Sequence, residues 1–392
     1  MGQDETLLQR GGPGARISRR AVLGGLSGLA GTVALGTSPA RSSTTLKARD
    51  VAASRGILFG SAFDQHIFAD VEYAKLLCRE CHIVTNNYSF KFDALRPGPD
   101  EVQFGGADAL LNFADHCDLK MRGHNLIWNE WLPDWVKQMS NSERALLLDR
   151  HIDEAVGHFA GKLHSWDVVN EPIWVDHGHP GGLRGGPWYD ALGADYIPHS
   201  FRRARAADPD VKLVLNEAYL EYNWKKPPYE TGPDPASSPW NNVREHFLAL
   251  VTKMVDDGVP IDAVGIESHL NPMRQSTYVR EDFLAFLNAI AALGLDIYIT
   301  ELDVNDVTLP DDPEERDRLV AEQYHSYLSD VLTVPAVKAI ITWELADSHT
   351  QEAEEARAQE KTDVRLPRSL PFDSDLEPKS AYRAIVSALS GA

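Results

Sequence analysis

Cysteine, basic charge and long apolar segments are all scarce in this chain of 392 residues. Only three cysteines occur, Cys78, Cys81 and Cys117. Cys78 and Cys81 lie in a helix-like run with no second pair of metal ligands nearby, so we expect buried thiols rather than zinc or redox chemistry. The sequence therefore predicts no metal site and no cofactor.

Basic residues number 38 against 58 acidic residues, which gives a formal net charge of −20. Such a surface repels the phosphates of nucleic acids and anionic membranes. We therefore expect neither as a partner. A neutral polysaccharide or oligosaccharide suits this charge, and we expect the protein to act as a monomer.

The longest apolar run lies near the N-terminus and covers only about 15 residues, whereas a membrane-spanning helix needs about 20. It follows Arg19 and Arg20 and ends before small residues at Ala40. This pattern predicts a twin-arginine export signal over residues 1–40, and hence a periplasmic or extracellular protein. The alternative is a disordered tail with a chance arginine pair. A short linker over 41–56 and a single domain over 57–392 would follow.

Eight apolar runs recur after this leader, separated by amphipathic stretches of helical length. They are Ile57 to Phe63, Ile83 to Asn87, Met121 to Trp128, Ser165 to Glu171, Leu213 to Glu217, Ala263 to Leu270, Ile297 to Val304, and Ala339 to Leu345. Eight strand-helix units predict an α/β fold, a single (β/α)8 TIM barrel. The long connections 172–192 and 220–240 are expected to build a substrate cleft, and 351–361 to form a solvated lid or helix.

Two of these runs lead directly into glutamates, Glu171 and Glu301. Strand C-termini form the active-site face of such a barrel, so carboxylates there are expected to be chemical. Hydrolysis of a glycosidic bond needs an acid for the leaving oxygen and a carboxylate for the sugar carbon. Carboxyls about 5–5.5 Å apart would retain the configuration and carboxyls about 6.5–9.5 Å apart would invert it. The residues alone leave that choice open.

Five motifs, in order along the chain, carry a resemblance to a known family. They are Arg-Gly-His-Asn-Leu-Ile-Trp at 122–128, Pro-x-Trp at 133–135, Trp-Asp-Val-Val-Asn-Glu at 166–171, Ile-Thr-Glu-Leu-Asp-Val at 299–304, and Phe-Asp-x-x-x-x-Pro-Lys-x-Ala-Tyr at 372–382. Together they resemble glycoside hydrolase family 10, the endo-β-1,4-xylanases, over nearly all of residues 57–388.

The resemblance implies a retaining mechanism with Glu171 as acid/base and Glu301 as nucleophile. It further implies that His269 contacts the nucleophile and is held by Asp303. The residues expected to bind substrate are Lys91, His124, Trp128, Asn129, Asn170, Glu267, His269 and Trp343. For the two histidines and Trp343, packing at the barrel top is the alternative role.

Several expected sugar-facing positions depart from the family pattern. Asn87 and Tyr88 replace a Glu-Asn pair, Asn129 replaces a histidine, Glu267 replaces a glutamine, and Gln351 replaces a tryptophan. Lost hydrogen-bonding groups can change discrimination between sugars by about 10⁴–10⁵. We therefore expect the reaction to be kept and the specificity to be altered.

The sequence thus favours a secreted retaining β-glycosidase that acts on xylan or a related β-linked polysaccharide. One alternative is a carbohydrate-binding barrel with little hydrolysis, and another is an exo-acting or non-xylan glycosidase. A metal-dependent barrel hydrolase using His124 and His269 would need more converging ligands, often a His-x-His on the first strand, where this chain has Asp64-Gln65-His66.

Overall fold

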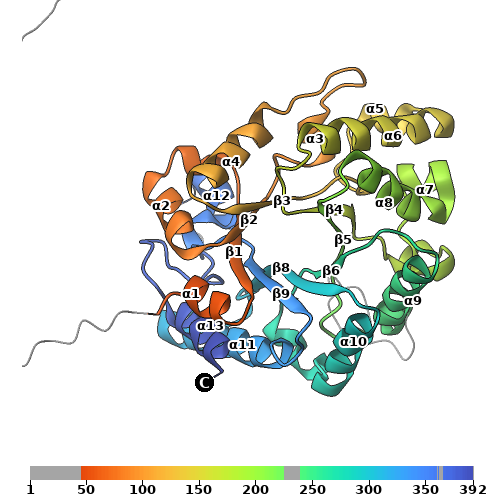
Figure 1. Cartoon of the computed structure of the whole chain (residues 1–392). Helices are drawn as coiled ribbons and strands as arrows, with labels where there is room; N and C mark the ends of the chain where they lie inside the picture. Colours follow the sequence, from red (N-terminus) through yellow and green to blue (C-terminus); the bar gives the residue numbers. More distant parts are fainter. Residues whose placement is uncertain (1–45, 225–238, 360, 362–364, 392) are drawn as a thin grey trace, which may run out of the picture. The chain divides into compact units, whose positions relative to one another are not determined.

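The computed structural model describes residues 46–224, 239–359, 361 and 365–391. The predicted export signal and most of the predicted loop 220–240 lie outside these residues. Within the described residues, eight parallel strands close into a barrel, because β1 pairs with β9 and β6 pairs with β8. The strands of the barrel are β1 Leu58–Phe63, β2 Ile83–Asn86, β3 Lys120–Gly123, β4 Ser165–Asn170, β5 Lys212–Glu217, β6 Ala263–Ile266, β8 Asp296–Val304 and β9 Val337–Thr342. The predicted (β/α)8 barrel is confirmed (Figure 1).

The sixth predicted run is divided in the structure. It forms β6 and a separate short strand, β7 His269–Leu270, which pairs with β8. Ser268 between them has φ 64°, a left-handed conformation that interrupts an extended strand. The chain therefore changes direction after β6, and Glu267 and His269 lie on the two sides of this break, at the end of the barrel where the strands finish.

Helices surround the barrel in Figure 1. They are α1 Ala48–Ser54, α2 Val71–Glu80, α3 Phe92–Leu95, α4 Gly105–His116, α5 Asp134–Gln138, α6 Asn141–His158, α7 Pro187–Leu192, α8 Tyr196–Ala207, α9 Val243–Asp256, α10 Arg280–Ala292, α11 Pro313–Val331, α12 Gln351–Ala358 and α13 Ser380–Ser390. Helix α6 begins at a capping box in which Ser140 and Glu143 bond each other's backbone amides. None of the helices within the described residues is long and apolar enough to cross a membrane.

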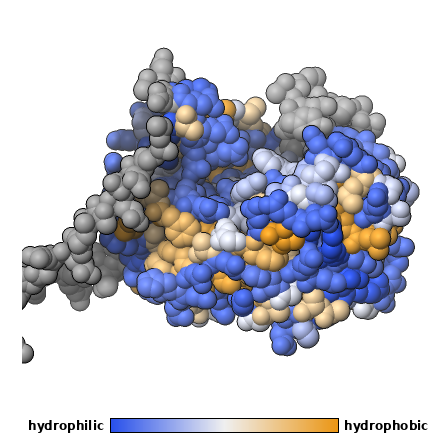
Figure 2. All heavy atoms as spheres, turned by 90° about the horizontal axis from the view of Figure 1, so that it is seen from above, coloured by the Kyte–Doolittle hydropathy of each residue, from blue (hydrophilic) through white to orange (hydrophobic). Residues whose placement is uncertain are grey.

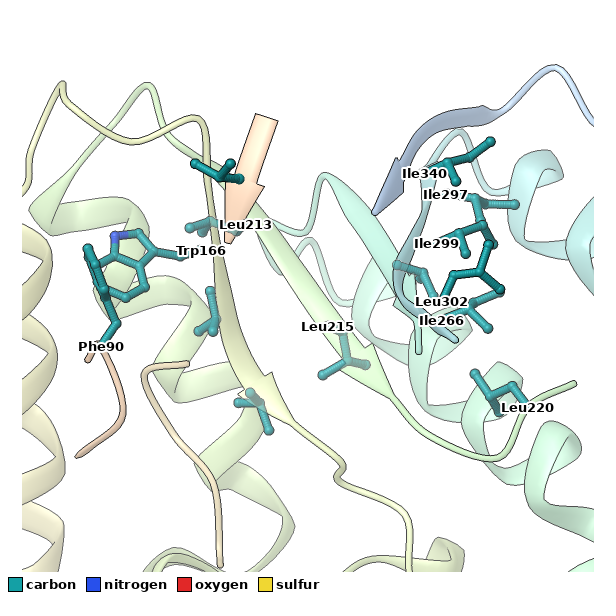
Figure 3. Packing of buried hydrophobic residues seen from close by; sticks show 14 of the residues in the cluster. Phe90, Trp166, Leu213, Leu215, Leu220, Ile266, Ile297, Ile299, Leu302 and Ile340 are labelled. Carbon is teal, nitrogen blue, oxygen red and sulfur yellow. The ribbon is translucent and has the colours of Figure 1, made fainter. Parts of the chain in front are cut away.

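The strands bury both faces, as a parallel barrel requires. One cluster fills the barrel interior and consists of Ile83, Val214, Ala263, Tyr298, Ala339 and Ile341. Their neighbours along the strands, such as Leu213 and Ile340, belong to the larger cluster beneath the helices. Figure 3 shows this outer cluster, including Trp166 beside Phe90 with ring centroids 5.6 Å apart.

Gly123 at the end of β3 makes room for this packing. A Cβ at Gly123 would lie 2.3 Å from the Trp166 ring, so only glycine permits the close approach of β3 and β4.

Helix α1 lies within the segment 41–56 that the sequence analysis assigned to a linker. Ala48 and Ala52 are fully buried, and the amide of Ala48 donates to the Tyr382 hydroxyl of α13 at 3.1 Å. The unit that contains the barrel therefore begins at Leu46.

The prediction of a free buried thiol is wrong for Cys78. Cys78 of α2 forms a disulfide with Cys117, which follows α4, and the Cα atoms are 5.2 Å apart. The sequence pattern drew attention to the neighbouring Cys81, whereas the fold places Cys117 next to Cys78. Cys81 remains a buried thiol, and burial raises its pKa.

The surface of the molecule is mostly hydrophilic on the face that Figure 2 shows, with hydrophobic patches between polar residues. Segment 351–361, expected to form a lid or a helix, contains helix α12.

Candidate active site

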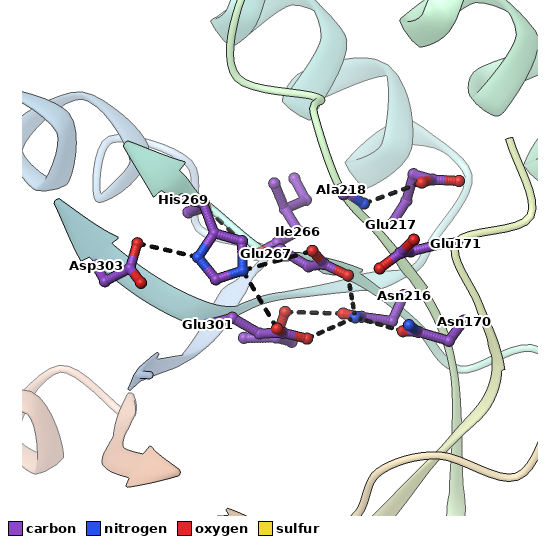
Figure 4. A network of polar contacts seen from close by, with 12 residues as sticks. Asn170, Glu171, Asn216, Glu217, Ala218, Ile266, Glu267, His269, Glu301 and Asp303 are labelled. Carbon is purple, nitrogen blue, oxygen red and sulfur yellow. Dashed lines mark hydrogen bonds and ion pairs between the residues drawn. The ribbon is translucent and has the colours of Figure 1, made fainter. Parts of the chain in front are cut away.

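Glu171 and Glu301 lie at the end of the barrel where the strands finish, and Figure 4 shows both side chains around Asn216. Glu171 directly follows β4 and has φ 45°, while Glu301 lies within β8. The carboxyl side chains are mostly buried, with 17% of Glu171 and 7% of Glu301 exposed. Their chemistry is therefore set by protein neighbours rather than by bulk water.

Positive and neutral donors surround Glu301. Asn216 Nδ2 donates to its Oε1 at 3.0 Å, His269 Nε2 lies 3.4 Å from Oε2, and His124 Nδ1 lies 3.9 Å from Oε1. Burial alone would raise the pKa of Glu301, but His124, His269 and Lys91 together lower it to about 2. Glu301 is therefore ionised at any ordinary pH.

Each of the two histidines is held by an aspartate. His269 Nδ1 lies 2.9 Å from Asp303, and His124 Nδ1 lies 2.9 Å from Asp167. Although burial opposes it, Asp303 and Glu301 raise the pKa of His269 well above its usual value. The imidazolium of His269 thus faces Glu301, which helps to keep that carboxylate charged.

Glu171 has a different neighbour, Arg184, from the connection after β4. Arg184 Nη2 donates to Glu171 Oε2 at 2.6 Å. Burial raises the pKa of Glu171, Arg184 opposes this effect, and the negative charge of Glu301 adds to the increase. Glu171 consequently holds a proton more readily than an exposed glutamate does, as a general acid must.

Asn216 links Asn170 to Glu301, and its backbone carbonyl accepts the backbone amide of Glu171 at 2.9 Å. Asn216 Nδ2 lies 2.8 Å from Asn170 Oδ1, and Asn216 Oδ1 accepts the Thr300 hydroxyl at 2.7 Å. Sequence reasoning did not identify Asn216. A signal was available, because β5 ends in Asn216-Glu217 as β4 ends in Asn170-Glu171.

Glu267 adds a third carboxyl at this centre and is only 3% exposed. Its Oε1 accepts from Asn216 at 3.1 Å. Burial raises the pKa of Glu267 well above its usual value, and repulsion from Glu301 and Glu171 raises it further. Glu267 therefore holds a proton more readily than an exposed glutamate does, and in its protonated form it can donate a hydrogen bond, as the amide of a glutamine would.

Glu267, His269 and Glu301 offer atoms within 4.8 Å of one another, a spacing that could hold a metal ion. A metal ligand must give up its proton. The raised pKa values of His269 and Glu267 oppose that, since both groups keep their protons beside Glu301. The arrangement fits an ion pair better than a metal centre.

Lys91 and Trp343 face the same centre. Burial lowers the pKa of Lys91, whereas Glu301 and Glu171 act to raise it, which places the ammonium near both carboxylates. Its Nζ lies 5.2 Å from the ring centroid of Trp128. The Trp343 ring stands edge to face with His124 and His269, at centroid distances of 5.6 and 6.4 Å.

A cleft of about 680 Å³ opens beside these residues. Its lining includes Asn87, Tyr219, Trp224, His269, Asp303, Trp343, Glu344, Thr350 and Gln351. Two departures from the family pattern, Asn87 and Gln351, therefore lie on the cleft wall. Tyr88 is 44% exposed, and its hydroxyl donates to Asp93.

Asn129, expected to bind substrate, has a structural contact. It is buried, and its Oδ1 accepts the amide of Trp188 at 3.0 Å. A Cβ at Gly186 would lie within 2.7–2.9 Å of the Asn129 side chain. Asn129 thus fixes the start of α7, and Trp188 Nε1 adds a bond to the carbonyl of Trp128.

Sequence reasoning also did not identify Arg184 or Glu344. Glu344 directly follows Trp343, is 1% exposed and has φ 71°, a conformation that favours glycine. Its Oε2 accepts the Tyr73 hydroxyl at 2.8 Å. Such strain in a glutamate at a cleft wall is typical of functional sites.

A closed β/α barrel whose strand ends carry carboxyls with pKa values shifted in opposite directions has the arrangement that a glycoside hydrolase needs. The comparison with protein families then names the group: the profile of Glycosyl hydrolase family 10 matches residues 47–388. The chain belongs to this family, as its motifs predicted.

Curated relatives and solved structures agree with this assignment. Endo-1,4-beta-xylanase A of Phanerodontia chrysosporium is 30% identical over 352 residues, which span 88% of this chain and 77% of that protein. The beta-1,4-xylanase of Dictyoglomus thermophilum is 32% identical over 288 residues, covering 71% and 75%. The crystal structure of native xylanase 10B from Thermotoga maritima superposes with a TM-score of 0.74 at 28% identity, covering 88% of this chain and 98% of that one.

Proposed function

We propose that the protein hydrolyses the β-1,4 bonds of xylan, or of a closely related β-linked polysaccharide, by double displacement. The observation that carries the proposal is the opposite direction of the pKa shifts of two carboxyls at the strand ends of one barrel. Glu301, with a pKa lowered to about 2, serves as nucleophile, and Glu171, whose pKa is raised, serves as acid/base.

In the first step, Glu301 attacks the sugar carbon, the bond to the leaving oxygen breaks with its electron pair, and Glu171 protonates that oxygen. In the second step, Glu171 takes a proton from water, and the water oxygen displaces Glu301 from the sugar. Asn170 directly precedes Glu171 and is linked to Glu301 through Asn216, a position that supports binding of the hydroxyl next to the reacting carbon. The names of the similar proteins, endo-1,4-β-xylanases, support xylan as substrate and attack within the chain.

The test uses NMR to determine the stereochemistry of the first product released from xylo-oligosaccharides. Retention is expected, and inversion would remove Glu301 from the role of nucleophile. Glu301→Gln should abolish turnover of xylan and of activated aryl xylosides alike, because an amide cannot attack. Glu281→Gln, an exposed change on α10, is the matched control and should keep full activity.

Substrate choice needs a separate measurement, because Asn87 and Gln351 line the cleft in place of the family's usual residues. Products should be analysed on plain, glucuronic-acid-substituted and arabinose-substituted xylans, with β-glucan as a control. Cleavage of one class at least tenfold better than the others identifies the substrate. Binding without turnover across the panel would favour a carbohydrate-binding barrel instead.

We also propose that the chain is exported by the twin-arginine route to the periplasm or the medium. Arg19 and Arg20 before an apolar run motivate the proposal. The disulfide between Cys78 and Cys117 adds support, because such bonds persist in oxidising compartments. Replacing both arginines with lysine should keep the enzyme inside the cell, and N-terminal sequencing of exported protein should locate the cleavage near Ala40.

A further inference from the structure

Arg184 lies in the connection after β4, which turns back so that the guanidinium reaches the end of its own strand. Ile173 and Leu183 pair as an antiparallel bridge, and the amide of Arg184 donates to the Pro172 carbonyl at 2.7 Å. Arg184 is only 3% exposed. These backbone contacts within the loop therefore hold the charged side chain of Arg184 beside Glu171.

The donors of Arg184 are directed at carboxylates and a carbonyl of the active-site face. Nη2 bonds Glu171 Oε2 at 2.6 Å, Nε bonds the Glu171 carbonyl at 2.7 Å, and Nη1 bonds Glu130 Oε1 at 3.0 Å. The guanidinium carbon also lies 4.3 Å from the ring centroid of Trp174. Two bonds to one residue fix both the backbone and the side chain of Glu171 through the planar set of donors of the guanidinium, which the compact ammonium of a lysine lacks.

We infer that Arg184 is a positioning residue for proton transfer: it holds Oε2 of Glu171, so that Oε1 exchanges the proton with the leaving oxygen, and it stabilises the carboxylate that results. The inference rests on the proposed role of Glu171 as acid/base. As the proton moves from Oε1 to the leaving oxygen, Glu171 gains a negative charge 2.6 Å from the guanidinium. When water later returns a proton to Oε1, that charge is lost again.

Electrostatics give the inference a direction that can be measured. Burial and the charge of Glu301 raise the pKa of Glu171, and Arg184 acts against both. Removing the guanidinium should therefore raise the pKa of Glu171 further and make it a weaker acid. The alkaline limb of the kcat/KM profile, which reports loss of the acid's proton in the free enzyme, should move to higher pH.

The experiment measures pH profiles of Arg184→Met and of wild type on two aryl xylosides, one with a poor and one with a good leaving group. We expect the alkaline limb of the variant to shift upward. We also expect kcat for the poor leaving group to fall by about 10–100-fold, with little change for the good one. KM should change little, because the buried guanidinium is not placed to touch substrate.

Two further variants separate positioning from folding. Arg184→Lys keeps the positive charge but loses the paired donors of the guanidinium. Its alkaline limb should therefore stay near that of wild type, while its kcat should lie between those of Arg184→Met and wild type. Arg205→Met is the matched control, because Arg205 also bonds a carboxylate, that of Asp262, and backbone carbonyls. Asp262 directly precedes β6, so this contact lies at the opposite end of the barrel from the active site. Its profile should match that of wild type.

Each result of these experiments either supports or overturns the inference on Arg184. Equal losses on both aryl xylosides with an unmoved alkaline limb in Arg184→Met would overturn the inference and leave Arg184 a structural clamp. If Arg184→Met does not fold, the test rests on Arg184→Lys. A shift of its alkaline limb despite the retained positive charge would also overturn the inference. Failure of the proposed function itself looks different: Glu171→Ala would then show no dependence on the leaving group.

Discussion

The two carboxylates of the site are held by different parts of the molecule. Glu301 is bound by side chains from the barrel itself, Asn216 of β5 and His269 of β7. Glu171 is bound by Arg184, which belongs to a loop. Strands therefore hold the ionised carboxylate, whereas the connection after β4 holds Glu171 and opposes the effect of burial on its pKa. This difference means that loop changes can alter acid strength and specificity without disturbing the nucleophile.

The largest test of this comparison is Glu171→Ala. We expect a loss of about 10²–10⁴-fold on substrates with poor leaving groups and a small loss on activated ones, because an acid matters only where the leaving oxygen needs a proton. Steady-state kinetics on a series of aryl xylosides measures the effect. Glu130→Ala is the matched control, since Glu130 shares Arg184 but is half exposed. If Glu130→Ala showed the stronger dependence, the roles of the two carboxyls would have to be exchanged.

A second change tests whether the comparison depends on the scaffold beneath the site. The disulfide between Cys78 and Cys117 closes a loop with a sequence separation of 39 and joins α2 to the end of α4. Replacing both residues with serine should lower the free energy of unfolding by about 2–4 kcal/mol, as measured by chemical denaturation. The pH limbs of activity should not move. A shift of either limb would show that the scaffold and the carboxylates are coupled.

The third change tests the groups that hold Glu301. His269 helps to hold the pKa of Glu301 near 2, so His269→Asn should raise that pKa and move the acid limb of kcat/KM to higher pH. We expect a loss of about tenfold at the optimum, roughly the 1.4 kcal/mol of one hydrogen bond to a charged group. Asp303→Asn should move the same limb in the same direction by less. The alkaline limb should move less than the acid limb in both variants, because His269 acts more weakly than Arg184 on the pKa of Glu171. A larger shift of the alkaline limb would contradict the assignment of His269 to Glu301.

The barrel and its two glutamates could be predicted because their signal is local. Buried parallel strands produce continuous apolar runs, and each run that ends in a polar residue marks the active-site end of the barrel. The same rule would have found Asn216, since the pair Asn216-Glu217 ends a strand. It was not applied there because that strand carries no wider motif.

The contacts of Arg184 and Cys117 could not be predicted in this way. The loop 172–186 has no periodicity, and nothing in its sequence indicates that it turns back onto Glu171. Cys117 lies far from Cys78 in the chain, so their pairing depends on how α2 and α4 pack. Glu344 is similar, because a positive φ at a glutamate is a property of the folded chain alone.

The smallest expected effect concerns Glu344, a buried carboxyl on the β9 side of the cleft. Burial raises its pKa well above the usual value, as burial also raises that of Glu171, but no arginine is among the groups that act on it most strongly. Because the pKa is higher in the folded state than in the unfolded one, its stabilising contribution is complete below about pH 4.3. That contribution is lost as the pH rises through the folded pKa.

Glu344→Gln keeps the shape and cannot ionise. The free energy of unfolding of wild type should therefore fall relative to the variant by up to about 1.4 kcal/mol per pH unit above pH 4.3, until the folded pKa is reached. Urea denaturation from pH 4 to 8 measures the difference. Glu354→Gln, a change to a partly exposed carboxyl on the neighbouring helix α12, is the matched control for the loss of a glutamate. Parallel curves for wild type and Glu344→Gln would mean that Glu344 ionises as an exposed glutamate does, and that the strained backbone at φ 71° serves the cleft wall rather than a neutral acid.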